Sequence, residues 1–280
     1  MDAMASEKQD HWTTNAYTNV ASFVPELANR VFEWLDPNPD DIILDIGCGD
    51  GLLSSKIKSK CHWVVGLDSS TNLIMAAQVK YSKTSNLLFE VRDCTRLNEP
   101  ASKAYTQNFH KVFSNAALHW ILRDSKTRSN VFESIHKALR PEGTFVFEMG
   151  GAGNVAEVHG ALISAMVHHG MSVQAAREAC PWYFPSEDMM RELLENAGFM
   201  VEKIEIEYRP TRLNEVEDGG LEGWVRLFGA SMLESLEKQK RERVIREVVE
   251  ALRSVVSREG GEGGQWLGYV RLRVLARKWT

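Results

Sequence analysis

The chain has 280 residues, 44% of them hydrophobic, and a formal net charge of −5 at pH 7. A chain of this length can bury one large α/β core, and its interspersed charges, which form no basic stripe, argue against a nucleic-acid partner. No apolar run is long enough to span a membrane and no signal-peptide hydrophobic region is present, so we expect a cytoplasmic protein without a membrane partner.

The cysteines and the paired histidines show no pattern of a metal site. His168 and His169 follow a helical stretch, with no carboxylate or cysteine at ligand spacing, so no metal is predicted there. The cysteines lack C-x-x-C spacing, which favours a reduced intracellular chain without structural zinc. They are Cys48, Cys61, Cys94 and Cys180.

The first predicted element in chain order is an amphipathic helix over residues 25–35, which the sequence D-P-N-P ends. We expect residues 1–24 to form an N-terminal lid segment and residues 25–280 to form a single domain. Lid insertions are expected within this domain at about 150–198 and 219–258, where the sequence departs from regular strand–helix alternation.

A glycine-rich turn follows this helix and is the most informative feature of the sequence. The apolar run 42–46 predicts a buried strand that enters the turn D-I-G-C-G-D-G over residues 45–51. A second predicted strand, 63–67, delivers Asp68 23 residues after Asp45. This spacing is typical of doubly wound sheets in which a carboxylate binds the ribose hydroxyls of a nucleotide.

The details of the turn decide between nucleotides. A dinucleotide fingerprint, G-x-G-x-x-G, requires a third glycine at position 52, which is Leu52. Asp50 would repel a pyrophosphate, whereas a ligand with a sulfonium and an ammonium group is attracted by acids. A nicotinamide oxidoreductase, although it shares this kind of sheet, is therefore disfavoured.

Strands and helices continue to alternate, which predicts an α/β fold with a doubly wound, seven-stranded, mostly parallel sheet. The insertions carry helices near 155–169, 221–237 and 239–257, and a glycine-rich hinge is expected at 259–264. The remaining predicted helices span 52–60, 71–81 and 127–139. The remaining predicted strands span 87–91, 111–115, 144–149, 200–208 and 269–276.

The glycine-rich turn resembles the first motif of class I S-adenosylmethionine (SAM) methyltransferases, which implies SAM as cofactor. In that family an acid after the third strand, here Asp93, accepts a hydrogen bond from the adenine amino group. An N-cap or turn aspartate is the alternative interpretation of Asp93. The cofactor-binding residues that the resemblance implies are Trp12, Tyr17, Asp45, Gly47, Gly49, Asp68, Ser69, Asp93, Cys94, Asn115 and Ala116.

The fourth predicted strand ends in N-A-A-L-H-W over residues 115–120. This run is similar to the corresponding segment of trans-aconitate methyltransferases. Its L-H-W portion resembles salicylate-type and juvenile-hormone-acid carboxyl methyltransferases, in which the tryptophan indole N–H helps to hold a substrate carboxylate. The resemblance implies catalytic roles for His119 and Trp120, although a structural histidine and a core tryptophan are the alternatives.

Three further residues are candidates for the wall of a substrate pocket. Trp182 and Tyr183 lie in the aromatic segment P-W-Y-F-P, which predicts either a pocket wall or packing of a lid on the core. Arg209 follows the sixth predicted strand, where it could pair with an acidic substrate or lie on the surface.

These features predict a SAM-dependent methyltransferase that acts on a small molecule, with a carboxylate oxygen as the preferred acceptor. A carboxylic acid is already ionised at pH 7 and needs no base. The alternatives are methylation of a hydroxyl, amine or thiol with His119 as general base, and a catalytically silent methyltransferase-like binding protein.

Overall fold

The computed structural model describes Trp12 and residues 28–97, 105–106, 108–214, 216, 219–260 and 263–279. Tyr17, and most of the predicted segment 1–24, lie outside the described residues. The fold class was predicted from alternating strand and helix patterns, and the described elements confirm it.

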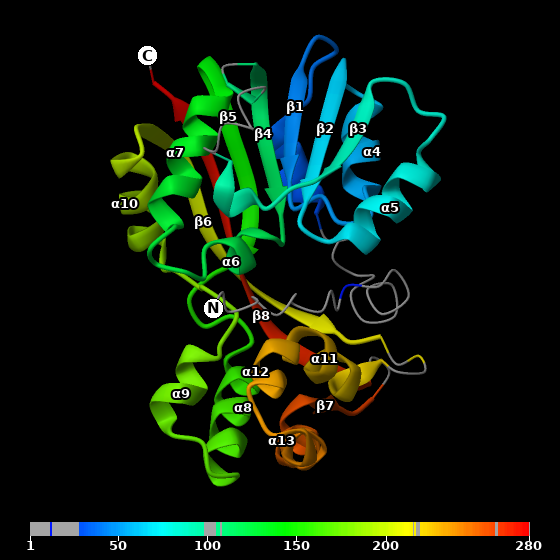
Figure 1. The fold of residues 1–280 in the computed structure, drawn as a ribbon, viewed down its shortest axis with the longest axis vertical. Helices are drawn as coiled ribbons and strands as arrows, with labels where there is room; N and C mark the ends of the chain where they lie inside the picture. Colours follow the sequence, from blue (N-terminus) through cyan, green and yellow to red (C-terminus); the bar gives the residue numbers. More distant parts are fainter. Residues whose placement is uncertain are drawn as a thin grey trace, which may run out of the picture.

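A twisted sheet organises the described chain, in the strand order β3-β2-β1-β4-β5-β8-β6 (Figure 1). Strands β1 to β5 pair in parallel, whereas β8 runs antiparallel to both of its neighbours, β5 and β6. The short β7 (Ser257–Arg258) pairs with β8 off this path. The other strands are β1 (Ile42–Ile46), β2 (Trp63–Asp68), β3 (Leu87–Val91), β4 (Phe109–Asn115), β5 (Leu139–Gly150), β6 (Phe199–Arg212) and β8 (Gly264–Lys278).

Helices cover both faces of the sheet because successive strand residues point to opposite sides. On one face, Ile43 and Phe113 pack with residues of α3 and α4. On the other face, Leu44 and Val112 pack with residues of α7 and α10. The helices of these layers are α3 (Asn29–Leu35), α4 (Leu52–Lys58), α7 (Arg128–Ala138) and α10 (Glu187–Asn196), while α5 (Thr71–Lys80) lies against β2 and β3.

A second group of helices forms its own apolar core beyond one end of the sheet, on the side of α6 (Leu118–Ile121) (Figure 1). Val158 and Leu162 pack there with Val244 and Val248. We call this group the helical cluster. It consists of α8 (Ala156–His168), α9 (Val173–Glu178), α11 (Gly220–Phe228), α12 (Ala230–Glu234) and α13 (Lys238–Val256).

The helical cluster differs from the predicted insertions in three places. The helix expected over 221–237 is broken at Gly229, a poor helix former that ends α11 and begins α12. Helix α10 leaves the first insertion and returns to the sheet, where Met190 and Leu194 join the main core. The expected glycine-rich hinge is instead the turn between β7 and β8, in which the Gly263 N–H donates to the Gly260 carbonyl at 3.0 Å.

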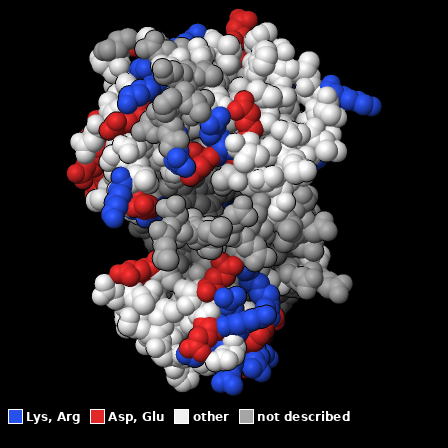
Figure 2. Space-filling view, in the orientation of Figure 1, with Lys and Arg blue, Asp and Glu red and all other residues white. Residues whose placement is uncertain are grey.

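Charged side chains of both signs mix on the surface. On the face shown in Figure 2, Lys and Arg lie beside Asp and Glu over the helical cluster. Arg226 of α11, for example, contacts Glu222 and Glu242, each at 2.7 Å. Among the described residues, no helix is long and apolar enough to cross a membrane.

Candidate active site

The glycine-rich turn after β1 has a backbone shape that depends on its glycines. Gly47 and Gly49 both adopt positive φ, at 73° and 57°. A Cβ added to Gly47 would lie 2.1 Å from the Cβ of Ala117, whereas one added to Gly49 would meet no atom of the described residues within 4 Å. Gly47 therefore allows the segment after β4 to pack directly on the turn, and Gly49 faces open space.

Asp68, at the end of β2, holds this turn in place. Its Oδ2 accepts a hydrogen bond from the Gly49 N–H at 3.0 Å, and its Oδ1 accepts from the Ser70 N–H at 2.9 Å. Each carboxylate oxygen has a second lone pair, so these bonds leave acceptor capacity for hydroxyl groups of a ligand. Ser69 lies exposed beside Asp68.

Asp45 lies buried beneath the turn, where Ser54 Oγ donates to its Oδ2 at 2.5 Å. Burial is the main cause that raises the pKa of Asp45 to about 7; the Ser54 hydrogen bond opposes this rise and the charge of Asp68 adds to it. A cationic ligand above the turn would offset this cost, because an opposite charge favours the ionised carboxylate.

Asp93 and Cys94 follow β3 at the same edge of the sheet. Asp93 is exposed, and its Oδ1 accepts from the Thr95 N–H at 2.9 Å and from the Thr95 hydroxyl at 2.7 Å. It thus caps the short helix η1 (Cys94–Arg96), which was the alternative interpretation of this residue. Cys94 is buried, and burial raises the pKa of its thiol, so it remains a neutral packing group.

The segment after β4 links the glycine-rich turn to a cavity. Asn115 is buried, and its Oδ1 makes no hydrogen bond to any described residue. Ala116 has φ of 55°, Ala117 packs on Gly47, and His119 and Trp120 form part of α6. The segment therefore contacts the turn on one side and the cavity on the other.

The cavity lies between the sheet edge and the helical cluster and measures about 60 Å³. Pockets for drug-sized ligands span roughly 300–1,000 Å³, so this space matches only one end of such a ligand. No acidic residue lines it among the described residues, and Arg271 is the one permanent charge in its wall. Its lining consists of Trp12, Ala116, His119, Trp120, Asn154, Val155, Trp182, Phe184, Trp224, Phe228, Tyr269 and Arg271.

Aromatic rings in contact with one another form most of the wall. The Trp120 ring centroid lies 5.4 Å from that of Trp12 and 5.9 Å from that of Trp182, with edge-on geometry in both pairs. It also stacks on Phe228 at 6.2 Å. Such pairs favour fixed ring positions, so the wall is a defined surface that excludes water.

His119 is buried in the cavity wall as a neutral imidazole. The Gly150 N–H donates to its Nδ1 at 3.4 Å, which places the ring proton on Nε2. Burial, together with the positive charge of Arg271, lowers the pKa of His119 to about 3. His119 is therefore arranged as a hydrogen-bond donor through Nε2.

Arg271 belongs to a buried group of charges on β8 and its neighbours. Its guanidinium lies 4.8 Å from the ring centroid of Tyr269, and its Nε lies 3.7 Å from Glu148 Oε1. Arg209 and Arg273 approach Glu148 more closely, at 2.8 Å and 2.5 Å. Glu148 thus contacts three arginines, of which Arg271 is the most distant and the one that lines the cavity.

The three predicted pocket residues do not all line this cavity. Trp182 lines it, whereas Tyr183 and Arg209 are outside its lining. The Tyr183 ring lies under the guanidinium of Arg128 at 3.5 Å, and Arg209 is held by Glu148. Sequence reasoning missed Tyr269 and Arg271. These residues alternate with Arg273 along β8, so the three side chains share one face of the strand, and this spacing was the available signal.

Backbone strain gathers at the same cavity. Ala116 and Val155 both adopt positive φ, at 55° and 45°, and both line the space. Left-handed backbone is unfavourable for a β-branched residue such as Val155. Strained residues of this kind cluster at functional sites, where the surrounding structure holds them in place.

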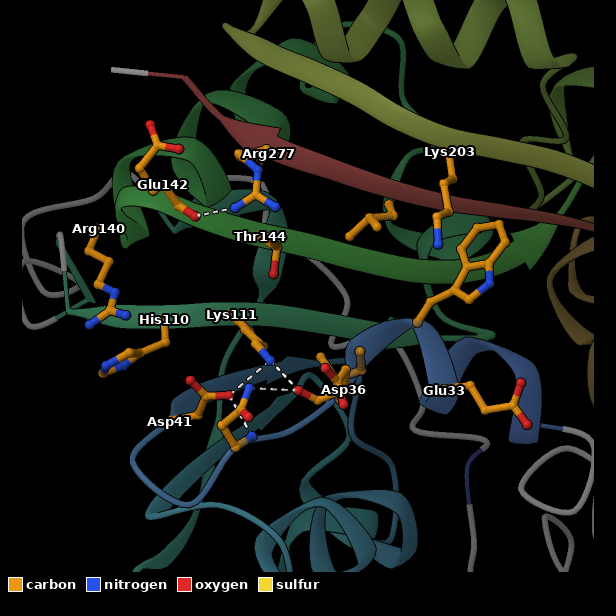
Figure 3. Close-up of a pocket in the computed structure, with 14 residues that line it drawn as sticks. Glu33, Asp36, Asp41, His110, Lys111, Arg140, Glu142, Thr144, Lys203 and Arg277 are labelled. Atoms are coloured by element: carbon orange, nitrogen blue, oxygen red, sulfur yellow. Dashed lines mark hydrogen bonds and ion pairs between the residues drawn. The ribbon is translucent and has the colours of Figure 1, made fainter.

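A larger hollow, of about 500 Å³, lies at the opposite edge of the sheet (Figure 3). Two of its cationic side chains are held by neighbours in the lining: Lys111 Nζ lies 3.0 Å from Asp41 Oδ2, and Arg277 Nη1 donates to the backbone carbonyl of Glu142 at 3.0 Å. Asp41 precedes β1, so the hollow lies at the amino ends of the parallel strands. Ligands of open α/β sheets bind at the carboxyl ends, where the glycine-rich turn and the aromatic cavity lie.

Known proteins resemble this chain over its whole length. A family model for a methyltransferase domain matches residues 43–143. The uncharacterized methyltransferase C70.08c of Schizosaccharomyces pombe is 36% identical over 271 residues, which cover 96% of this chain and 99% of that protein. The chain belongs to the class I SAM-dependent methyltransferases. This membership confirms the predicted enzyme class and cofactor, and it excludes the nicotinamide alternative.

Two other relatives align with about half of this chain, over about half of their own length. A malonyl-[acyl-carrier protein] O-methyltransferase of Marinomonas sp. is 26% identical over 149 residues, which cover 52% of this chain and 51% of that protein. The 18S rRNA (guanine-N(7))-methyltransferase bud23 of Schizosaccharomyces pombe is 32% identical over 144 residues, covering 49% and 51%. The two relatives have different acceptors, so the shared half does not identify the acceptor of this methyltransferase.

Solved structures share the fold of this methyltransferase. The YcgJ protein of Bacillus subtilis has a TM-score of 0.59 at 12% identity and covers 91% of this chain and 99% of its own. A phosphoethanolamine N-methyltransferase of Haemonchus contortus, solved with S-adenosylhomocysteine, has a TM-score of 0.53 at 16% identity, with coverage of 91% and 53%. At these identities the likeness establishes the fold alone.

Proposed function

We propose that this methyltransferase transfers the methyl group of SAM to a carboxylate oxygen of a small acid, which binds with its carboxylate end in the aromatic cavity. The observation that carries the proposal is the charge of the cavity wall. Arg271 is its one permanent charge among the described residues, and no carboxylate lines it. An acceptor carboxylate complements this wall, whereas a protonated amine would meet a buried cation.

The cofactor is expected above the glycine-rich turn, and the residues present suit it. Two acids, Asp45 and Asp68, favour a positively charged ligand, and the backbone at Gly49 faces open space. The buried Asn115 Oδ1, which makes no hydrogen bond to a described residue, is a further acceptor at this place. The remaining proposed contacts are Gly47, Ser69, Asp93, Cys94 and Ala116, with Trp12 and Tyr17 from the N-terminal segment.

SAM supplies an electrophilic methyl group, and the protein has to hold the acceptor oxygen in line with it and exclude water. In the proposed mechanism the Arg271 guanidinium attracts the carboxylate. The Nε2–H of His119 and the indole N–H of Trp120 donate to it and orient one oxygen lone pair toward the methyl group. No proton is removed, because the acid is already ionised at neutral pH.

The alternative in which His119 acts as general base has less support. A base is most effective with a pKa near the working pH, and burial lowers the pKa of His119 to about 3. Its Nδ1 lone pair already accepts from the Gly150 N–H. The O-methyltransferase acting on a malonyl-carrier protein is one relative whose name agrees with an oxygen acceptor.

The chemistry of the product tests the proposal. Purified enzyme, radiolabelled SAM and a panel of metabolite acids, alcohols, amines and thiols would identify an acceptor, and the labelled product would be treated with mild alkali. A methyl ester releases volatile methanol under this treatment. A product that keeps its label would contradict a carboxylate acceptor and favour the alternative with His119 as base.

A variant of Trp120 tests how the acceptor is held. Trp120→Phe keeps an aromatic ring but removes the indole N–H, and we expect a loss of about 1–3 kcal/mol in kcat/KM for the acceptor, roughly 5- to 150-fold. Trp182→Phe is the matched control, because it changes a ring in the same wall that has no proposed donor role. Equal losses in both variants would reduce Trp120 to a packing residue.

A further inference from the structure

A metal-ligand set is present in the helical cluster, outside the aromatic cavity. His168 Nδ1 lies 2.9 Å from both carboxylate oxygens of Glu247, and His169 Nε2 lies 3.1 Å from Glu247 Oε2. The candidate ligand atoms of these three residues all lie within 4.8 Å of one another. The sequence places no acid beside the two histidines, but the fold brings Glu247 next to them across 78 residues of chain.

The three residues come from two helices whose positions are fixed by packing. His168 ends α8 and His169 is its C-cap residue, while Glu247 lies within α13. The adjoining apolar side chains of the two helices share one buried core, including Leu162 of α8 and Val248 of α13. The ligand atoms are therefore held near one another by the fold, which lowers the cost of ordering them around an ion.

The spacing and chemistry of these atoms suit a divalent ion of intermediate softness. In a tetrahedral zinc site with bonds of about 2.0–2.1 Å, neighbouring ligand atoms lie ~3.3 Å apart, close to the separations between these histidines and Glu247. Two imidazoles and one carboxylate form a ligand set that zinc enzymes use, with a fourth position left for water. The site is accessible, since the His168 side chain is 72% exposed and that of Glu247 is 34% exposed.

The electrostatic field of α8 also favours a bound cation. The C-terminal end of a helix carries partial negative charge, and both histidines lie at that end of α8. We propose that His168, His169 and Glu247 form a zinc site that clamps α8 to α13. Because α8 begins beside Val155 in the cavity wall, the clamp would also steady the helix that borders the acceptor cavity.

Metal titration of the full chain tests this proposal. After removal of metals with EDTA and dialysis, ZnCl₂ is added and binding is followed by calorimetry and by thermal unfolding. We expect one bound zinc ion and, at about a hundredfold excess over Kd, a rise in Tm of roughly 5 °C. MgCl₂ should give no such rise, because Mg²⁺ prefers oxygen ligands and octahedral geometry.

Variants assign the ion to this site. His169→Ala and Glu247→Gln should each weaken zinc binding tenfold or more, while His62→Ala, which changes an exposed histidine elsewhere, should leave it unchanged. Binding of S-adenosylhomocysteine would verify that each variant is folded. Unchanged zinc affinity in the two site variants, or no zinc effect on the wild type, would overturn the proposal. The Tm of Glu247→Gln relative to the wild type gives a further check. If this variant lowers Tm by the same amount in EDTA and in zinc, Glu247 only forms hydrogen bonds with the histidines, and the proposal is overturned.

Discussion

The two sides of the candidate active site are built in different ways. The cofactor side comes from one short stretch, in which Asp45, Gly47, Gly49 and Asp68 are contributed by β1, β2 and the turn between β1 and α4. The acceptor side is assembled from distant segments, with Trp120 after β4, Trp182 before α10, Phe228 in α11 and Arg271 in β8. One side is polar and acidic, and the other is aromatic, with Arg271 as the single buried cation among the described residues that line it.

This difference explains what the comparisons with other proteins can reveal. The matched family model covers residues 43–143 and thus includes the whole glycine-rich turn, but it ends before Trp182, Phe228 and Arg271. Under the proposed function, the local half binds the cofactor that the family shares, and the assembled half selects the acceptor. Substitutions on the two sides should therefore alter different measured quantities.

The largest expected effect is a loss of folding stability at Gly47, where the glycine-rich turn contacts the segment after β4. Gly47→Ala places a Cβ 2.1 Å from the Cβ of Ala117 and adds a side chain at positive φ. We expect a loss of more than about 3 kcal/mol in the free energy of unfolding, because neither backbone can move freely. Denaturant unfolding monitored by circular dichroism would measure it.

Two variants control this prediction. Gly49→Ala also has positive φ but meets nothing within 4 Å, so it should cost only about 1 kcal/mol. Adding Ala117→Gly to Gly47→Ala should restore part of the stability by removing the clash. Equal losses of unfolding free energy in Gly47→Ala and Gly49→Ala would show that the packing of Ala117 on Gly47 contributes little to stability.

Asp68→Ala tests the cofactor side alone. It removes the acceptor for two backbone N–H groups and the proposed acceptor for the ribose hydroxyls. Hydrogen bonds to a charged group are each worth about 1.5–3 kcal/mol, so affinity for S-adenosylhomocysteine should fall roughly 10- to 150-fold. Calorimetry on a folded variant would measure this, and unchanged affinity would remove Asp68 from the proposed site.

Arg271→Gln tests the acceptor side alone. Loss of the buried cation should raise KM for the acceptor by roughly 10- to 100-fold, in line with about 1.5–3 kcal/mol for a charge-assisted contact, and leave affinity for S-adenosylhomocysteine unchanged. Arg209→Gln is the matched control, because Arg209 pairs with the same Glu148 but does not line the cavity. A similar rise in KM in the control would trace the effect to the charge cluster as a whole.

The smallest expected effect is the change in methyl-transfer activity of His119→Asn, because asparagine retains an N–H donor. Activity should remain within about tenfold of the wild type, whereas loss of a true base costs about 10²–10⁴-fold. Because burial lowers the pKa of His119 to about 3, this residue stays neutral above that pH, and kcat/KM should show no histidine titration between pH 5 and 8. A rate that falls tenfold per pH unit below pH 6.5 in the wild type, but not in His119→Asn, would restore the base role.

Most of the fold could be predicted because it follows from local patterns. The apolar runs at 42–46 and 63–67 and their helices are fixed by nearby residues, and the structure places them within a residue or two of the prediction. Strands β6 and β8 are longer than predicted because they continue beyond the predicted ranges, where residues such as Thr211 pair with Leu267 of the neighbouring strand. Such pairing depends on tertiary contacts that a local pattern does not contain.

The candidate site could be predicted on its local side only. The turn and Asp68 have a characteristic spacing, and the structure brings them together by direct hydrogen bonds. Arg271 was missed because its position at the cavity depends on β8 pairing with β5, where the partner of Arg271 is Gly150, 121 residues earlier (271 − 150). Arg209 was chosen because it follows the predicted strand 200–208; it pairs with Glu148 and is not part of the cavity lining.

The position of β8 has a consequence for synthesis of the chain. Strands β5 and β6 do not pair with each other, and both pair with β8, which is the last of the described elements to be made. Until β8 is available, a nascent chain exposes an unpaired edge of β5 and lacks Tyr269 and Arg271. A ribosome-bound intermediate therefore forms the glycine-rich turn early, yet it stays open to aggregation and lacks part of the aromatic cavity wall until β8 inserts.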